Sequence, residues 1–135
     1  MISSLVGLIV HNSMIYFSYR ILVLDLFKKH VAPFQIPDSI NMGFILLGGY
    51  VLSFILTILF VKYLDNYGFV TGFNFGVLVG ILIGYGDIVV LNGLSKLFDV
   101  KILFINSHWY LLLYGTIGGC IGFSLKKLNS IVTIT

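Results

Sequence analysis

Three ionisable residues lie inside otherwise apolar stretches of the chain: His11, Asp25 and Asp87. An ionised aspartate at the centre of a bilayer costs at least about 2.5 kcal/mol, so it must be protonated, paired or hydrated. Such residues are therefore candidates for an intramembrane polar site, such as a proton or ion path with Arg20 as counter-charge. The structural alternative is that they hydrogen-bond to neighbouring helices or reach the lipid headgroups.

A polar stripe runs along the first apolar segment, because four polar residues recur every seven positions: Ser4, His11, Ser18 and Asp25. Residues with this spacing lie on one face of a helix. The stripe either lines a water path or faces another subunit, or it marks a helix packed inside a bundle whose polar groups satisfy one another. Asp87 follows Gly80 by seven residues and therefore shares the glycine-rich face of its own segment.

The sequence offers no recognisable catalytic, cofactor or metal site. The three histidines, at positions 11, 30 and 108, lack the spacing of metal ligands. The glycines of GGYVLS and GYGDIV lie in continuous apolar runs and do not form a phosphate-binding loop. No serine or cysteine has a recognisable base beside it. We therefore expect a protein that is not an enzyme and that carries neither cofactor nor metal.

Composition indicates that lipid is the solvent for most of the surface. Of the 135 residues, 59% are hydrophobic and 10% are charged, and the mean hydropathy is +1.07. A soluble domain carries about 25% charged residues, which this chain cannot supply. The net charge of +3 comes from lysines at the ends of apolar runs, where they meet headgroups. This pattern does not indicate nucleic-acid binding.

Four apolar segments are long enough to cross a bilayer, which takes roughly 20 residues. We expect an all-α fold, an integral membrane bundle of four transmembrane helices that forms a single domain over residues 1–135. The helices are predicted at about 2–27, 42–61, 73–94 and 105–125. The longest loop, HVAPFQIPDSIN, contains both prolines, and the tail LNSIVTIT follows the last helix. An even number of crossings places both termini on one side, and the lysine pair at 126–127 favours the cytoplasm.

Glycine spacing is the strongest local pattern. In the third segment Gly72, Gly76, Gly80 and Gly84 recur every four residues, and the fourth segment repeats the device with Gly115 and Gly119 and with Gly118 and Gly122. Such faces let helix backbones approach closely, which drives association in lipid. We predict tight helix packing here. The same glycines serve either to pack two helices within one monomer or to form a subunit contact.

Three stretches resemble a group of small, uncharacterised bacterial membrane proteins with four helices: YFSYRILVLDLFKKH, GFNFGVLVGILIGYGD and GTIGGCIGFSLKK. The resemblance implies the four-helix topology and no activity. The chain departs from the usual bacterial composition, since Ala32 is its only alanine, and this favours an AT-rich genome. We expect a location in the bacterial cytoplasmic (inner) membrane.

Two functional interpretations follow. The first is an accessory or scaffold subunit of a larger membrane complex, because the chain has no recognisable chemistry but several small-residue faces. The second is a homo-oligomeric channel or transporter for protons, ions or a small solute, in which Asp87 and the polar stripe form the path. The expected partners are the lipid bilayer and other membrane subunits or further copies of the chain, and not nucleic acid.

Overall fold

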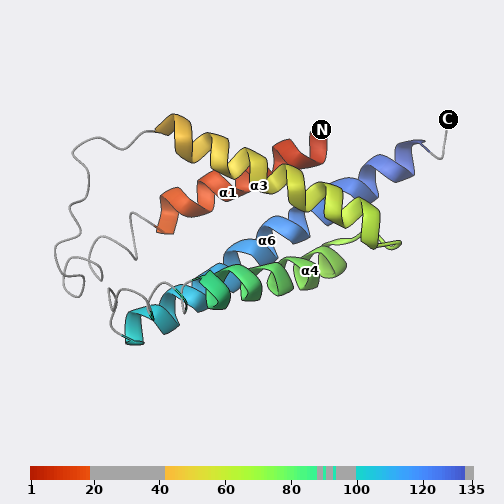
Figure 1. Cartoon of the computed structure of the whole chain (residues 1–135). Coiled ribbons are helices and arrows are strands. Elements are labelled where there is room, and N and C mark those ends of the chain that lie inside the picture. The colour runs from red at the N-terminus through yellow and green to blue at the C-terminus, as the bar shows by residue number, and fades with distance from the viewer. Residues whose placement is uncertain (19–41, 88–89, 91–92, 94–99, 133–135) are drawn as a thin grey trace.

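The computed structural model describes residues 1–18, 42–87, 90, 93 and 100–132. In these residues the chain forms helices and no strand, which confirms the all-α prediction. The helices (Figure 1) are α1 (Ile2–Ser18), α3 (Met42–Tyr63), α4 (Phe69–Ile81), its continuation as the π-helix η2 (Leu82–Asp87), and α6 (Val100–Val132).

Helices that follow one another along the chain run in alternating directions. Gly7 of α1 lies beside Ser53 of α3, whereas His11 lies beside Gly49, so the two helices are antiparallel. Helix α6 runs along the others and contacts α1, α3 and α4. The amino terminus and the carboxyl-terminal end of α6 lie at the same end of the molecule (Figure 1).

The apolar core is centred on α6. The buried hydrophobic side chains of the described residues come from α3 and α6, and partly buried side chains of α1 and α4 pack against them. The buried ones are Leu56, Phe60, Leu113, Tyr114, Ile117 and Ile121. The Phe60 ring meets the edge of the Phe75 ring of α4 at a centroid distance of 5.8 Å. Aromatic pairs with this T-shaped geometry are favourable beyond their burial, so Phe60 links α3 to α4.

The most extensive helix contact is that between α4 and α6, and it is made by backbone atoms. A Cβ atom at Gly72 would collide with the carbonyl group of Gly118, and a Cβ atom at Gly76 would collide with that of Tyr114. The partner positions on α6 decrease as those on α4 increase, so these helices are antiparallel. Only glycine allows this distance of approach.

The same contact continues along both helices. A Cβ atom at Gly80 would lie 2.8 Å from the carbonyl oxygen of Tyr110, and one at Gly84 would lie 3.1 Å from that of Ser107. Seen from α6, a Cβ atom at Gly122 would collide with the carbonyl oxygen of Gly68.

Two other glycines of α6 receive aromatic side chains of α4. A Cβ atom at Gly115 would lie 2.9 Å from the Phe73 ring, and one at Gly119 would lie 2.8 Å from the Phe69 ring. The two glycine pairs predicted on α6 thus have different tasks, since Gly118 and Gly122 meet backbone and Gly115 and Gly119 accommodate rings.

Helix α6 is longer than the sequence patterns predict. It begins at Val100 instead of about 105 and extends past the predicted end at 125 to Val132. The residues VKILF contain no helix-breaking residue, and in the tail the Ser130 hydroxyl donates to the Lys127 carbonyl at 2.7 Å. Helix α4 begins at Phe69 instead of about 73. Residues 19–27, which complete the first predicted helix, and the proline loop lie outside the described residues.

Two of the described helices are long and apolar enough to cross a membrane, over Leu46–Tyr63 and Phe69–Gly86. Helix α1 is apolar but shorter over its described length, and α6 is longer but more polar. In each of the two candidate spans only 22% of the residues are buried inside the molecule.

Replacing a glycine at the α4–α6 contact tests this packing. We expect Gly76→Ala to lower the free energy of unfolding by about 1–3 kcal/mol, because its methyl group has no space beside Tyr114. Gly48→Ala is the matched control, since no atom lies within 4 Å of a Cβ there. It should be neutral or stabilise α3 by roughly 0.5–1 kcal/mol. Thermal unfolding in detergent micelles measures both, and equal melting temperatures would contradict the backbone contact.

Candidate functional site

The polar stripe of α1 faces the interior of the molecule. Ser4, His11 and Ser18 have exposed fractions of 0%, 7% and 5%. The Ser4 hydroxyl donates to the Met1 carbonyl at 2.6 Å, and the Ser18 hydroxyl donates to the Met14 carbonyl. Serine hydroxyls in helices commonly bond to carbonyls of the preceding turn. These two hydroxyls are therefore satisfied within α1. The fourth residue of the stripe, Asp25, lies outside the described residues.

His11 is buried against a glycine of α3. A Cβ atom at Gly49 would lie 2.5 Å from Nδ1 and 3.0 Å from Cε1 of the His11 ring. The absence of a side chain at Gly49 is therefore what admits the imidazole between α1 and α3. Within the described part of the chain, the buried Nδ1 atom has no hydrogen-bond partner.

Ser53 supplies a second unpartnered atom in the same contact. It lies one turn after Gly49, its exposed fraction is 0%, and its Oγ has no hydrogen-bond partner among the described residues. Gly7, one turn before His11, faces Ser53, and a Cβ at Gly7 would lie 3.1 Å from the Ser53 Cβ. Two facing helices thus each contribute one small residue and one unpartnered polar atom.

Among the residues that the structure describes, this contact, formed by Gly7, His11, Gly49 and Ser53, is the strongest candidate site. A buried polar atom without a partner costs about 1–3 kcal/mol, so each of the two is unusual. A neutral imidazole accepts a hydrogen bond at one nitrogen, and a hydroxyl both donates and accepts. Each of the two atoms therefore has an unused capacity for one hydrogen bond. The described residues contain no group of three or more His, Cys, Asp or Glu side chains able to hold a metal ion.

The next small residue of α3, Thr57, does not add a free group to the site. Its hydroxyl donates to the Ser53 carbonyl at 2.7 Å. Across the molecule, the hydroxyls of Ser3 and Ser124 lie 3.2 Å apart and connect α1 to α6. Gly49, Ser53 and Thr57 recur every four residues on α3, and all three are buried.

His11 and Asp87 lie at different levels of the bundle. Gly7 lies against Ile121, and Gly84 lies against Ser107. These two residues of α6 are 14 positions apart, which at 1.5 Å per residue separates the levels by about 21 Å. Asp87 ends η2, beyond Gly84. His11 lies one turn closer than Gly7 to the Asp87 end of the bundle, so roughly 20 Å separates His11 from Asp87 along the bundle axis. The described residues therefore do not bring His11 and Asp87 together.

Sequence patterns did not indicate a polar contact at the η2 end of the molecule. The Ser107 hydroxyl donates to the Gly84 carbonyl at 3.0 Å, which satisfies a carbonyl of the π-helix. The Tyr85 hydroxyl lies 3.3 Å from Nδ1 and 3.5 Å from Nε2 of His108. His108 Nδ1 lies 2.8 Å from the Phe104 carbonyl, to which it donates, so Nε2 is the acceptor for Tyr85.

The pairing of His108 with Tyr85 links α6 to η2. The structural feature that the sequence patterns did not indicate is the π-helix η2. Its wider turn shifts the residues after Ile81 relative to an α-helix, and hydropathy does not encode this shift.

Comparisons of the chain with known protein families, with characterised proteins and with solved structures found no match.

Substitutions at Ser53 test the candidate site. We expect Ser53→Ala to leave the free energy of unfolding unchanged or raise it by about 1–3 kcal/mol, because it removes an unpartnered buried hydroxyl. Thr57→Val, which removes a bonded hydroxyl from the same face, should lower it by about 1 kcal/mol. Thermal unfolding in detergent compares the two. A loss at Ser53→Ala equal to that at Thr57→Val would show that the Ser53 hydroxyl has a partner, such as a bound water.

Proposed function

We propose that the chain is an integral membrane protein in which all four helices lie in the bilayer, and that it serves as an accessory or scaffold subunit of a larger membrane complex. The observation that carries the membrane location is the exposure of its most apolar helices. The core helix of a soluble protein would be mostly buried, whereas only 22% of each candidate span is. Both spans also lie far from the amino terminus, where a signal sequence would be.

The outer face of α3 supports the membrane location. Four large side chains there, Leu47, Val51, Ile55 and Ile58, are between 46% and 57% exposed. They fall at intervals of four, four and three residues and so form one stripe along the helix. Contact with water would cost about 25 cal/mol for each Å² of this surface, so lipid or another apolar helix covers it.

A subunit function is supported by the way polar and small residues are distributed. The glycines of α4 and α6 are used in the contact between these helices, and the polar stripe of α1 points inward. The surfaces available to a neighbour are therefore aliphatic and aromatic, as on α3 and at Val70, Leu78 and Leu82 of α4–η2. Such surfaces suit packing against lipid or other membrane helices and supply no chemistry. We place the protein in the bacterial cytoplasmic membrane, in line with the composition and the resemblance to small bacterial membrane proteins.

The alternative function is a homo-oligomeric channel or transporter. One observation favours it, namely the two unpartnered polar atoms His11 Nδ1 and Ser53 Oγ inside the bundle. In this alternative the two atoms bind the transported proton or ion at one point along a path that also includes Asp87 and Asp25.

The mass of the native particle distinguishes the two functions. Extracted from its own membrane in mild detergent, the 15.1 kDa chain should migrate in a particle with other proteins in constant ratio. A discrete particle that contains only copies of this chain would contradict the subunit function and support the alternative.

Flux measurements test the alternative directly. If the chain conducts, purified protein in liposomes should pass protons or ions down a gradient, and Asp87→Asn should abolish this flux because the carboxylate is lost. Unchanged thermal unfolding of Asp87→Asn would show that folding is retained. The absence of flux in the unmodified protein under every gradient tried would exclude the channel.

A further inference from the structure

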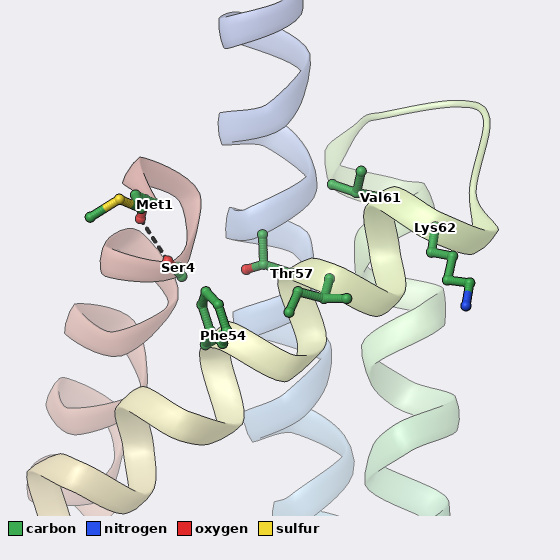
Figure 2. A pocket seen from close by; sticks show the side chains of 7 residues that line it. Met1, Ser4, Phe54, Thr57, Val61 and Lys62 are labelled. Carbon is green, nitrogen blue, oxygen red and sulfur yellow. Dashed lines mark hydrogen bonds between the residues drawn. The ribbon is translucent and has the colours of Figure 1, made fainter.

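A pocket of about 290 Å³ lies between the first turn of α1 and one stripe of α3. Met1, which precedes α1, and Ser4 line one side, and Phe54, Ile58, Val61 and Lys62 are among the residues that line it from α3 (Figure 2). The α3 residues follow the intervals of a single helix face. The pocket is therefore an elongated groove that runs along α3 for about 12 Å.

The interior of this groove is suited to an apolar chain. Its two hydroxyls are already bonded, since Ser4 donates to the Met1 carbonyl at 2.6 Å and Thr57 donates to the Ser53 carbonyl at 2.7 Å. Figure 2 shows Phe54, Thr57 and Val61 along the α3 side of the groove and Met1 and Ser4 across from them. A polar ligand would lose its hydration here and gain few hydrogen bonds, whereas methylene groups would lose nothing.

A positive charge lies at one end of the groove. Lys62 belongs to the last turn of α3, and its Nζ lies 5.5 Å from the centre of the Tyr63 ring. Lysine and tyrosine at the end of an apolar span mark the boundary between hydrocarbon and headgroups. Helix α6 brings more positive charge to this end, because Gly122 lies beside Phe60, and Lys126 and Lys127 follow about one turn later.

We propose that the groove binds one anionic phospholipid, with an acyl chain along Phe54 and Ile58 and the phosphate at Lys62. The orientation follows from the bilayer, because a lipid chain extends from the boundary marked by Lys62 toward the membrane centre, which is the direction of the groove. The negative headgroup complements Lys62, which lines the groove. This proposal depends on the membrane location proposed above, and it gives the α1–α3 pair a specific lipid contact.

The test uses the full chain in nanodiscs of phosphatidylcholine that contain a fraction of phosphatidylglycerol. Native mass spectrometry of the released protein should find one retained phosphatidylglycerol in preference to phosphatidylcholine. Lys62→Gln should reduce this preference about fivefold, because one lysine near the headgroup is lost. Ile58→Trp should reduce retention of both lipids by filling the groove.

Lys127→Gln is the matched control. It removes the same charge from the same end of the molecule, but Lys127 lies over the Phe123 ring of α6, away from the groove. It should retain the lipid as the unmodified protein does. Equal losses in Lys62→Gln and Lys127→Gln, or no retained phosphatidylglycerol in a protein that reconstitutes, would overturn the lipid site alone. A chain that remains soluble without detergent would overturn the membrane location and the lipid site with it.

Discussion

The backbone contact between α4 and α6 is the constraint on which the rest of the structure depends. In the membrane location proposed above, lipid offers no hydrophobic force between helices, so close packing must hold them together. Glycines on both helices bring the carbonyl groups of each against the backbone of the other, at Gly72 with Gly118 and at Gly76 with Tyr114. Helix α6 is thereby fixed along α4, and its other faces receive α1 and α3.

Three small residues of α3 lie inside, whereas several large ones lie outside. On α3 the inner face carries Gly49, Ser53 and Thr57, while the outer stripe includes Val51 and Ile55. The inner face also holds the large core residues Leu56 and Phe60. Unlike a surface helix of a soluble protein, α3 has no polar outer face, so hydropathy does not tell its inner face from its outer face.

Spacing in the sequence was informative wherever one residue type had one physical use. Glycines four apart identified the face that α4 presents to α6, and serines and histidine seven apart identified the buried face of α1. Residue spacing did not predict the structure where the same residues are compatible with several backbone conformations. The stretch VKILF extends α6 because nothing in it stops a helix, and the π-helix at Leu82–Asp87 has no hydropathy pattern of its own. Periodicity also could not tell whether a buried polar atom such as His11 Nδ1 has a partner.

The two halves of the bundle differ in how completely their contacts are satisfied, and this difference bears on function. In the α4–α6 contact, backbone atoms of the two helices pack directly against each other. Among the described residues, the α1–α3 contact instead contains two buried polar atoms without hydrogen-bond partners. Their cost of about 1–3 kcal/mol each makes α1 the easier helix to displace. A conducting protein needs water at His11, yet the residue is only 7% exposed and Ile121 packs beside Gly7. Conduction would therefore require α1 to move, whereas a scaffold subunit would use only the outer faces as they stand, and this difference is the reason that we propose the subunit.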